Sequence, residues 1–129
     1  MTAAFAPGFY TTSADAASVA GDWRLAGWTP KVLRLSDELG PQARREVLVE
    51  LGRAVGALEP VTTTGALDAA LGRLEPQTVV VWVRGATFAD EQPAVWSALS
   101  DVFVARARRA PAFAVVLAGA DKRSKERDR

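Results

Sequence analysis

The strongest pattern along the chain is an uninterrupted apolar run, TVVVWV, which occupies residues 78–83 between Pro76 and Gly85. β-branched and aromatic residues without polar alternation are typical of a strand that is buried on both faces. Such a strand needs a covering layer on each side, and in a short chain helices in crossover connections supply it. The run therefore predicts an α/β fold with a parallel sheet.

Three further segments have the patterns of strands. Residues 8–12 (GFYTT) could form a short first strand, and residues 31–35 (KVLRL) alternate as expected of a strand nearer an edge. Residues 113–119 (FAVVLAG) form the last apolar run. Together with residues 78–83 they predict a small parallel sheet of three or four strands flanked by helices.

Helical periodicity fills the spaces between these strands. We expect a helix after residues 8–12, capped by Ser13 or Asp15 and ending near Gly27. A second helix begins at Pro41 and ends at Gly56, and its predicted buried residues are Val47, Leu48, Leu51, Ala54 and Val55.

The last long helix has Pro93 in its first turn, and its predicted buried residues are Val95, Trp96, Leu99, Val102 and Phe103. Residues 85–92 before it are expected to form a connection, and Asp90 in it could cap the helix. Right-handed crossovers would pack all these helices against the sheet.

A polar segment between the second helix and the apolar run is the first candidate for function. Residues 58–65 contain Pro60 and three consecutive threonines, Thr62, Thr63 and Thr64, and a short helix follows at residues 66–71. The threonines could cap this helix, contact a partner or present backbone amides to an anion. In the same segment Glu59, Asp68 and Glu75 outnumber Arg73, so it either steers a basic partner or forms a solvated face.

Composition excludes several kinds of chemistry. The 129 residues suit one domain, residues 1–129, and the chain has no cysteine and no histidine. Thiolate nucleophiles, disulfides and the commonest metal ligand are therefore excluded, and the serines have no histidine partner. The acidic pairs at residues 37–38 and 90–91 are explained as helix caps. We expect a protein that is not an enzyme and binds no cofactor or metal.

The net charge of +1 gives no overall field toward nucleic acid or an anionic membrane. No apolar run reaches the about 20 residues of a membrane span, and the N-terminus lacks the basic start of a signal peptide, so we expect a cytoplasmic protein without membrane contact. Residues 120–129 are charge-mixed and are predicted to be disordered.

One local cluster favours nucleic acid instead, and its basic residues are Arg106, Arg108, Arg109, Lys122, Arg123 and Lys125. Tryptophans can stack on bases, but Trp82 and Trp96 lie on predicted core faces. Trp23 and Trp28 are less determined and could border an interface.

The order of these elements over residues 30–119 resembles the barstar family of small intracellular ribonuclease inhibitors. The resemblance is carried by the helix that ends in Gly56-Ala57-Leu58-Glu59-Pro60, by Leu67-Asp68-Ala69 in the short helix, and by Phe103 before the closing Val115-Val116-Leu117. Bacterial members of the family often have an additional N-terminal strand–helix unit, which residues 8–28 would match.

The resemblance implies a non-catalytic protein that docks into the basic active site of a nuclease through residues 59–75. The family's aromatic loop positions fall on Thr62 and Thr63, its glycine on Thr64 or Gly65, and its asparagine on Ala66. One helix acid is kept as Asp68, a second falls on Gly72, and the acids of the last helix fall near Ala105 and Arg109.

We therefore expect a protein-binding module, with a ribonuclease inhibitor or immunity protein as the family's implied function. The expected partner-binding residues are Thr62, Thr63, Thr64, Asp68, Gly72, Arg73 and Glu75. Two alternatives remain open, a nucleic-acid-associated protein that uses the arginine-rich helix end and tail, and a structural, self-associating subunit of the same fold.

Overall fold

The apolar run forms strand β3 (Thr78–Trp82), and all five of its residues are buried. The computed structural model describes residues 6–35, 43–109 and 111–119. In it β3 is an inner strand of a four-stranded, all-parallel sheet with the order β1-β4-β3-β2. The predicted α/β fold with a small parallel sheet flanked by helices is confirmed.

The other inner strand is β4 (Phe113–Gly119), which is also a continuous apolar run. The two edge strands are β1 (Gly8–Asp15) and β2 (Thr29–Leu33). β1 is longer than predicted, and β2 begins and ends two residues earlier than the predicted 31–35. Pro30 is tolerated within β2 because an edge strand does not need every backbone N–H for the ladder.

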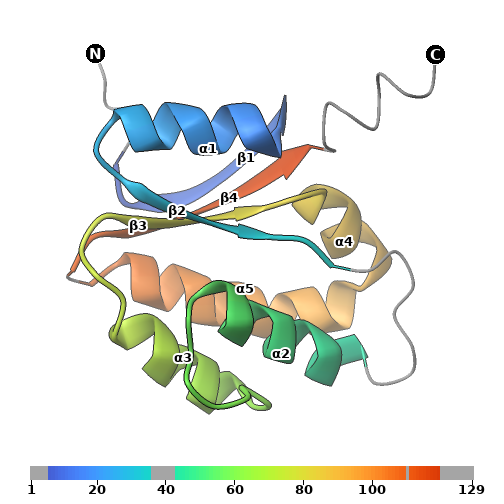
Figure 1. Cartoon of the computed structure of the whole chain (residues 1–129). Helices are drawn as coiled ribbons and strands as arrows, with labels where there is room; N and C mark the ends of the chain where they lie inside the picture. The colour runs from blue at the N-terminus through green and yellow to red at the C-terminus, as the bar shows by residue number, and fades with distance from the viewer. Residues whose placement is uncertain (1–5, 36–42, 110, 120–129) are drawn as a thin grey trace.

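The helices cover both faces of the sheet (Figure 1). α1 (Ala16–Leu25) lies on one face, and α2 (Ala43–Ala54), α3 (Thr64–Gly72) and α5 (Pro93–Ala107) lie on the other. The chain passes from β2 to β3 to β4 in one direction along the sheet, whereas β1 to β2 runs in the opposite direction. Since crossovers are right-handed, the reversal puts α1 on the opposite face from the other helices.

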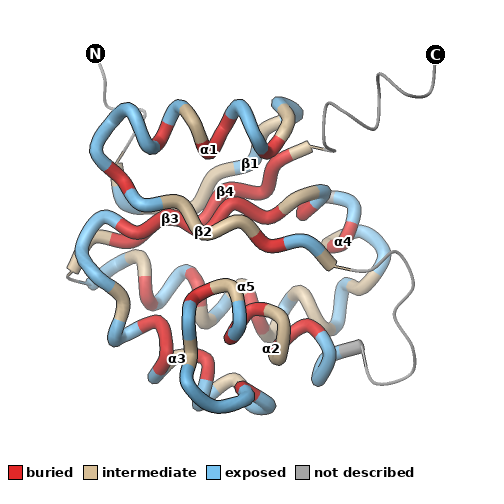
Figure 2. Tube along the Cα trace, viewed as in Figure 1, coloured by how far each residue is buried: buried red, intermediate tan, exposed pale blue. Residues whose placement is uncertain are grey.

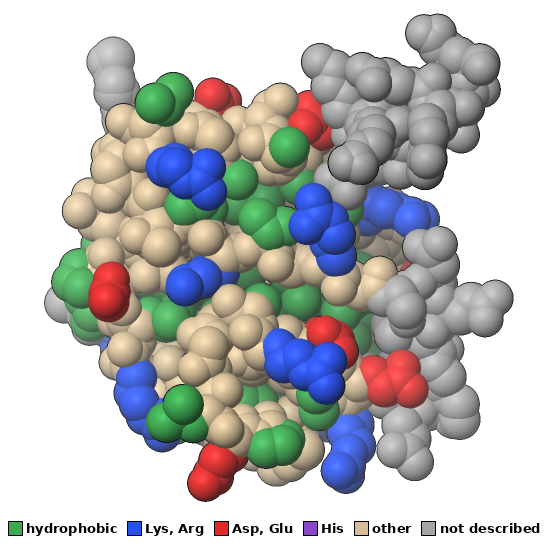
Figure 3. Space-filling model, viewed as in Figure 1, with side chains coloured by type: hydrophobic (Ala, Val, Ile, Leu, Met, Phe, Trp, Pro, Cys, Tyr) green, Lys and Arg blue, Asp and Glu red, His purple; other side chains and the backbone are tan. Residues whose placement is uncertain are grey.

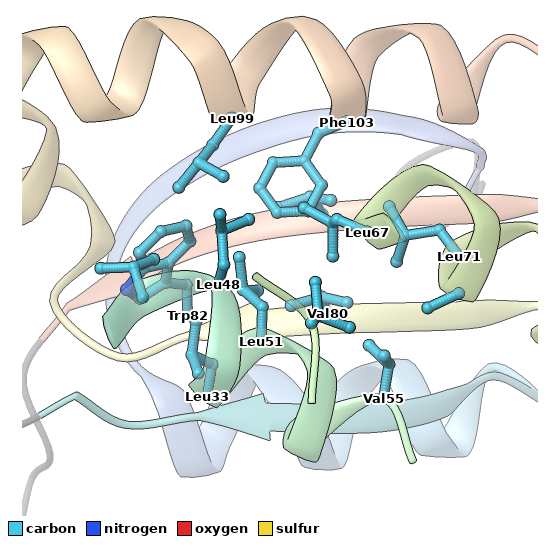
Figure 4. Close-up of a cluster of buried hydrophobic side chains, with 14 of the residues drawn as sticks. Leu33, Leu48, Leu51, Val55, Leu67, Leu71, Val80, Trp82, Leu99 and Phe103 are labelled. Carbon is cyan, nitrogen blue, oxygen red and sulfur yellow. The ribbon is translucent and has the colours of Figure 1, made fainter. Parts of the chain in front are cut away.

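Two hydrophobic cores result, one on each side of the sheet (Figure 2). On the larger side, side chains from the helices converge over Val80 and Trp82 (Figure 4). On the α1 side, Trp23 and Trp28 are 5% and 4% exposed and pack edge to face, with ring centroids 4.9 Å apart. Trp23 belongs to α1 itself, and both rings lie in the core between this helix and the sheet.

Between β3 and α5 the sequence prediction needs a correction. Residues expected to form an irregular connection form a helix, α4 (Gly85–Glu91), so Asp90 lies inside α4 and does not cap α5. Gln92 occupies the N-cap of α5 without a side-chain hydrogen bond, and Pro93 begins the helix as predicted. Packing of the Phe88 ring on Trp82, at a centroid distance of 5.0 Å, gives this short helix a tertiary contact.

Most predicted core residues are buried. Within α5, however, Leu99 and Phe103 are buried while Val95, Trp96 and Val102 are only half-buried. Three predictions lie outside the described residues, namely the helix start at Pro41, the caps at residues 37–38 and the disorder of residues 120–129.

Candidate docking surface

The loop before α3 is held to the body of the protein by Val61. Val61 is 3% exposed and lies over Gly52 of α2, where an added Cβ would come within 2.7 Å of the Val61 side chain. This close approach fixes the end of the loop and leaves Leu58, Glu59 and Pro60 exposed. We call residues 57–75 the loop–α3 surface.

The start of α3 explains part of the threonine run. Thr63 is the N-cap residue, and its Oγ1 accepts a hydrogen bond of 3.0 Å from the backbone N–H of Ala66. The helix-capping interpretation is confirmed for Thr63. Thr62 is exposed, and Thr64 is the half-buried first residue of the helix.

Asp68 forms an ion pair across to α5. One of its carboxylate oxygens lies 3.2 Å from Nη2 of Arg109, and the side chains are 45% and 47% exposed. Asp68 on α3 therefore faces an arginine at the end of α5. The negative charge of Asp68 is consequently partly neutralised by Arg109 of the same chain.

The seven predicted partner-binding residues all lie on the loop–α3 surface, and none is buried. They are divided between two sides of α3, because residues 68 and 72 follow the helix on the Arg109 side, whereas Arg73 belongs to the opposite side. Beyond the end of the helix, Glu75 is exposed. The segment therefore offers two separate contact areas.

A hollow of about 540 Å³ lies between the loop and the Arg73 side of α3. Its lining comes from the loop and from one helical stripe, and consists of Ala57, Leu58, Glu59, Pro60, Val61, Ala66, Ala69, Ala70 and Arg73. Leu58 is 97% exposed at this hollow. Leu58, Ala66 and Ala69 are not among the predicted partner-binding residues, although alanines at positions i, i+3 and i+4 before Arg73 are a signal in the sequence.

Arg106 at the end of α5 is fully buried, with 0% of its surface exposed. Its Nε donates to the carbonyl oxygen of Leu71 at 2.9 Å, and its Nη1 donates to those of Arg109 and Pro111 at 3.1 and 2.8 Å. The guanidinium also lies 5.0 Å from the ring centroid of Phe113. Burial lowers the pKa of Arg106, as does the charge of Arg109, while Asp68 opposes them.

This burial corrects the grouping of Arg106 with the basic cluster at the end of α5. A guanidinium enclosed by backbone carbonyls and an aromatic ring is not available to a phosphate backbone. Arg109 is engaged with Asp68, and Arg108 is exposed. The lysines and arginine of the predicted cluster beyond residue 119 lie outside the described residues.

Charges of both signs are interspersed around the loop–α3 surface. Glu59, Asp68 and Glu75 are accompanied by Arg73 and by Arg109, and Arg109 lies outside the segment that was predicted to be locally acidic. The face seen in Figure 3 shows both Lys or Arg and Asp or Glu in its lower half, where α2 and α3 lie. Recognition at this surface must therefore depend on shape and on individual charges.

Within residues 6–35, 43–109 and 111–119, no group of three or more acidic side chains is placed to hold a metal ion. None of the helices in these ranges has the length and apolar character needed to span a bilayer. Comparisons of the chain with protein-family models, curated proteins and solved structures found no match.

Proposed function

We propose that this protein is a non-catalytic binding module that docks another protein through the loop–α3 surface. The observation that carries the proposal is Leu58, a large apolar side chain that is 97% exposed and lies at a hollow of about 540 Å³. Exposed apolar side chains next to a concavity mark surfaces at which binding of a partner lowers the free energy, because it removes apolar area from water.

Anchoring of this surface supports the proposal. Val61 fixes the loop, Thr63 fixes the start of α3, and Arg106 holds the last turn of the helix through Leu71. A preformed surface loses little conformational entropy on binding, which increases affinity for a given contact area.

The resemblance to the barstar family supports a ribonuclease as the partner, with inhibition or immunity as the outcome. In that family acidic side chains imitate the negative charge of the substrate. Here Asp68 is the acid retained on the short helix, and its pairing with Arg109 lowers the field that a basic active site would experience.

Opposite substitutions within this ion pair test the ribonuclease proposal. Asp68→Asn removes the acid, so binding to a basic ribonuclease should weaken at least about tenfold, as expected for a contact of more than about 1.4 kcal/mol. Arg109→Gln frees the carboxylate and should accelerate association at low salt. If the pair acted only through stability, both substitutions would change binding in the same direction. Calorimetry and stopped-flow kinetics against a panel of ribonucleases provide the measurement.

The wider docking proposal is tested with the exposed leucines. Leu58→Ala should weaken binding of whichever protein is recovered with this chain from its own cells. Leu25→Ala is the matched control, because Leu25 is 90% exposed on α1, on the other side of the sheet. Docking through the loop–α3 surface is wrong if Leu58→Ala and Asp68→Asn leave every detected interaction at the affinity of the Leu25→Ala control.

A further inference from the structure

The hollow and its neighbouring leucine have complementary shapes on one surface. Leu58 projects into solvent, while Ala66, Ala69 and Ala70 present only methyl groups to the hollow next to it. A single exposed leucine is ordinary in a folded protein. A projecting apolar side chain beside a hollow lined by small residues is more informative, because each is the shape that the other would accept.

The charges at the hollow are also complementary to one another. Glu59 lines it from the loop and Arg73 from the last part of α3, and both side chains are exposed. Neither forms an ion pair within the described part of the chain. One uncompensated acid and one uncompensated base therefore flank the same hollow.

If two copies of the chain were related by a two-fold axis, the leucine of each copy would face the hollow of the other, and the acid of each copy would face the base of the other. In an isologous interface each residue meets a different residue of the partner, and the second meets the first in return. We propose that the hollow is a self-association surface whose occupant is a second copy of this chain. Leu58 of each copy enters the hollow of the other, and Glu59 of each copy faces Arg73 of the other.

Charge complementarity favours a second copy over an unrelated protein. A different partner would need its own projecting side chain, its own concavity and two charges in the reverse order, whereas a second copy has all of them. Nine residues line the hollow, compared with about 20 to 30 residues a side in a standard interface. The dimer is consequently weak, with a dissociation constant in the micromolar range, on the order of 1 to 100 µM.

Such a dimer would also affect docking of another protein, and this consequence rests on the proposed function. The two-fold contact covers Leu58 and the Arg73 side of α3, so docking of another protein through the same residues competes with dimerisation. Protein concentration would then regulate access to the loop–α3 surface.

Charge reversal tests the proposal by sedimentation equilibrium of the full chain, between about 1 µM and about 1 mM. Glu59→Arg and Arg73→Glu should each raise the dissociation constant at least tenfold, because each places like charges opposite one another twice. An equimolar mixture of the two variants should recover the wild-type association as a heterodimer. The double variant Glu59→Arg/Arg73→Glu should recover it as a homodimer.

Glu75→Arg is the control, because Glu75 is an exposed acid on the same segment that does not line the hollow. It should dimerise as the wild type does. Far-UV circular dichroism and the urea midpoint establish that every variant is folded. The proposal is overturned if the wild type is monomeric throughout the range, if the single variants associate like the wild type, or if mixing them restores nothing.

These outcomes separate the two proposals. A wild-type monomer that binds a partner protein through Leu58 would overturn self-association and leave the docking function in place. A wild-type dimer that responds to the charge reversals, but for which Leu58→Ala changes no partner interaction, would overturn only the docking function.

Discussion

The guanidinium of Arg106 on α5 donates a hydrogen bond of 2.9 Å to the backbone carbonyl oxygen of Leu71 on α3. Leu71 lies in the last turn of α3, and its carbonyl oxygen also accepts a hydrogen bond of 3.2 Å from the backbone N–H of Leu74. A side chain distant in sequence thus adds a second donor at the end of the helix that carries the candidate docking surface. Arg106 has a positioning role and makes no contact with solvent.

Replacing Arg106 by methionine should lower the free energy of unfolding by roughly 2 to 4 kcal/mol, because the carbonyl oxygens of Leu71, Arg109 and Pro111 each lose the hydrogen bond from the buried guanidinium. Urea unfolding followed by tryptophan fluorescence measures the change. Arg108→Met is the control, since Arg108 is the exposed neighbour and should change stability by less than about 0.5 kcal/mol. Equal effects at both positions would refute the positioning role of Arg106.

Thr63→Ala should cost about 1 kcal/mol, because the backbone N–H of Ala66 loses its acceptor at the start of α3. Thr62→Ala, one residue earlier and exposed, should be close to neutral. Thr63→Ser keeps the hydroxyl and should retain most of the stability. Chemical denaturation of the three variants is the measurement, and a Thr62→Ala loss as large as that of Thr63→Ala would contradict the assigned cap.

Two helical glycines should respond in opposite directions to alanine. Gly21→Ala on α1 meets no atom within 4 Å, so it should stabilise by about 0.5 to 1 kcal/mol through helix propensity. Gly52→Ala on α2 brings its Cβ to 2.7 Å from the Val61 side chain and should destabilise despite the same propensity gain. Thermal unfolding distinguishes the signs. A stabilised Gly52→Ala would show that the loop is not held at this point.

Asp68→Asn and Arg109→Gln should each change the free energy of unfolding by less than about 1 kcal/mol, because both side chains of the pair are nearly half exposed. Denaturant titrations at low and high salt test this, and salt should reduce even the small difference. Larger losses would mean that the pair stabilises the packing of α3 on α5, and the ribonuclease binding test would then need correction for unfolding.

The sheet and its helices could be predicted from the sequence because the apolar runs are long and are bounded by proline and glycine. Val79 to Trp82 and Phe113 to Ala118 are buried on both faces, and burial on both faces is what removes polar alternation from a strand. The prediction placed edge strand β2 two residues too late. Its bounds are set by its pairing with β3, from Thr29 opposite Thr78 to Leu33 opposite Trp82, and this pairing is a tertiary feature.

Helix α4 was missed because nothing local requires it. Arg84 adopts a left-handed conformation, with φ of 58°, immediately before the helix, and Gly85 lies against Leu117 of β4. These features and the packing of Phe88 on Trp82 stabilise a helix where the local sequence pattern predicts an irregular connection.

The candidate surface was only partly predictable. Thr63 and Asp68 could be assigned to a capped, exposed helix from spacing alone. Asp68 and Arg109 are 41 positions apart, and Arg106 and Leu71 are 35 positions apart, and no pattern in a single sequence predicts such contacts. The hollow likewise depends on where the loop folds back onto α3.

Strand β1 finds its partner only in β4, with Gly8 opposite Ala114, so about a hundred residues of chain must be synthesised between the two halves of this pairing. At a translation rate of about 5 to 20 residues per second, Phe9 and Tyr10 wait roughly 5 to 20 s without a neighbouring strand. The nascent chain is thus exposed to misfolding or chaperone capture through β1 until β4 leaves the ribosome.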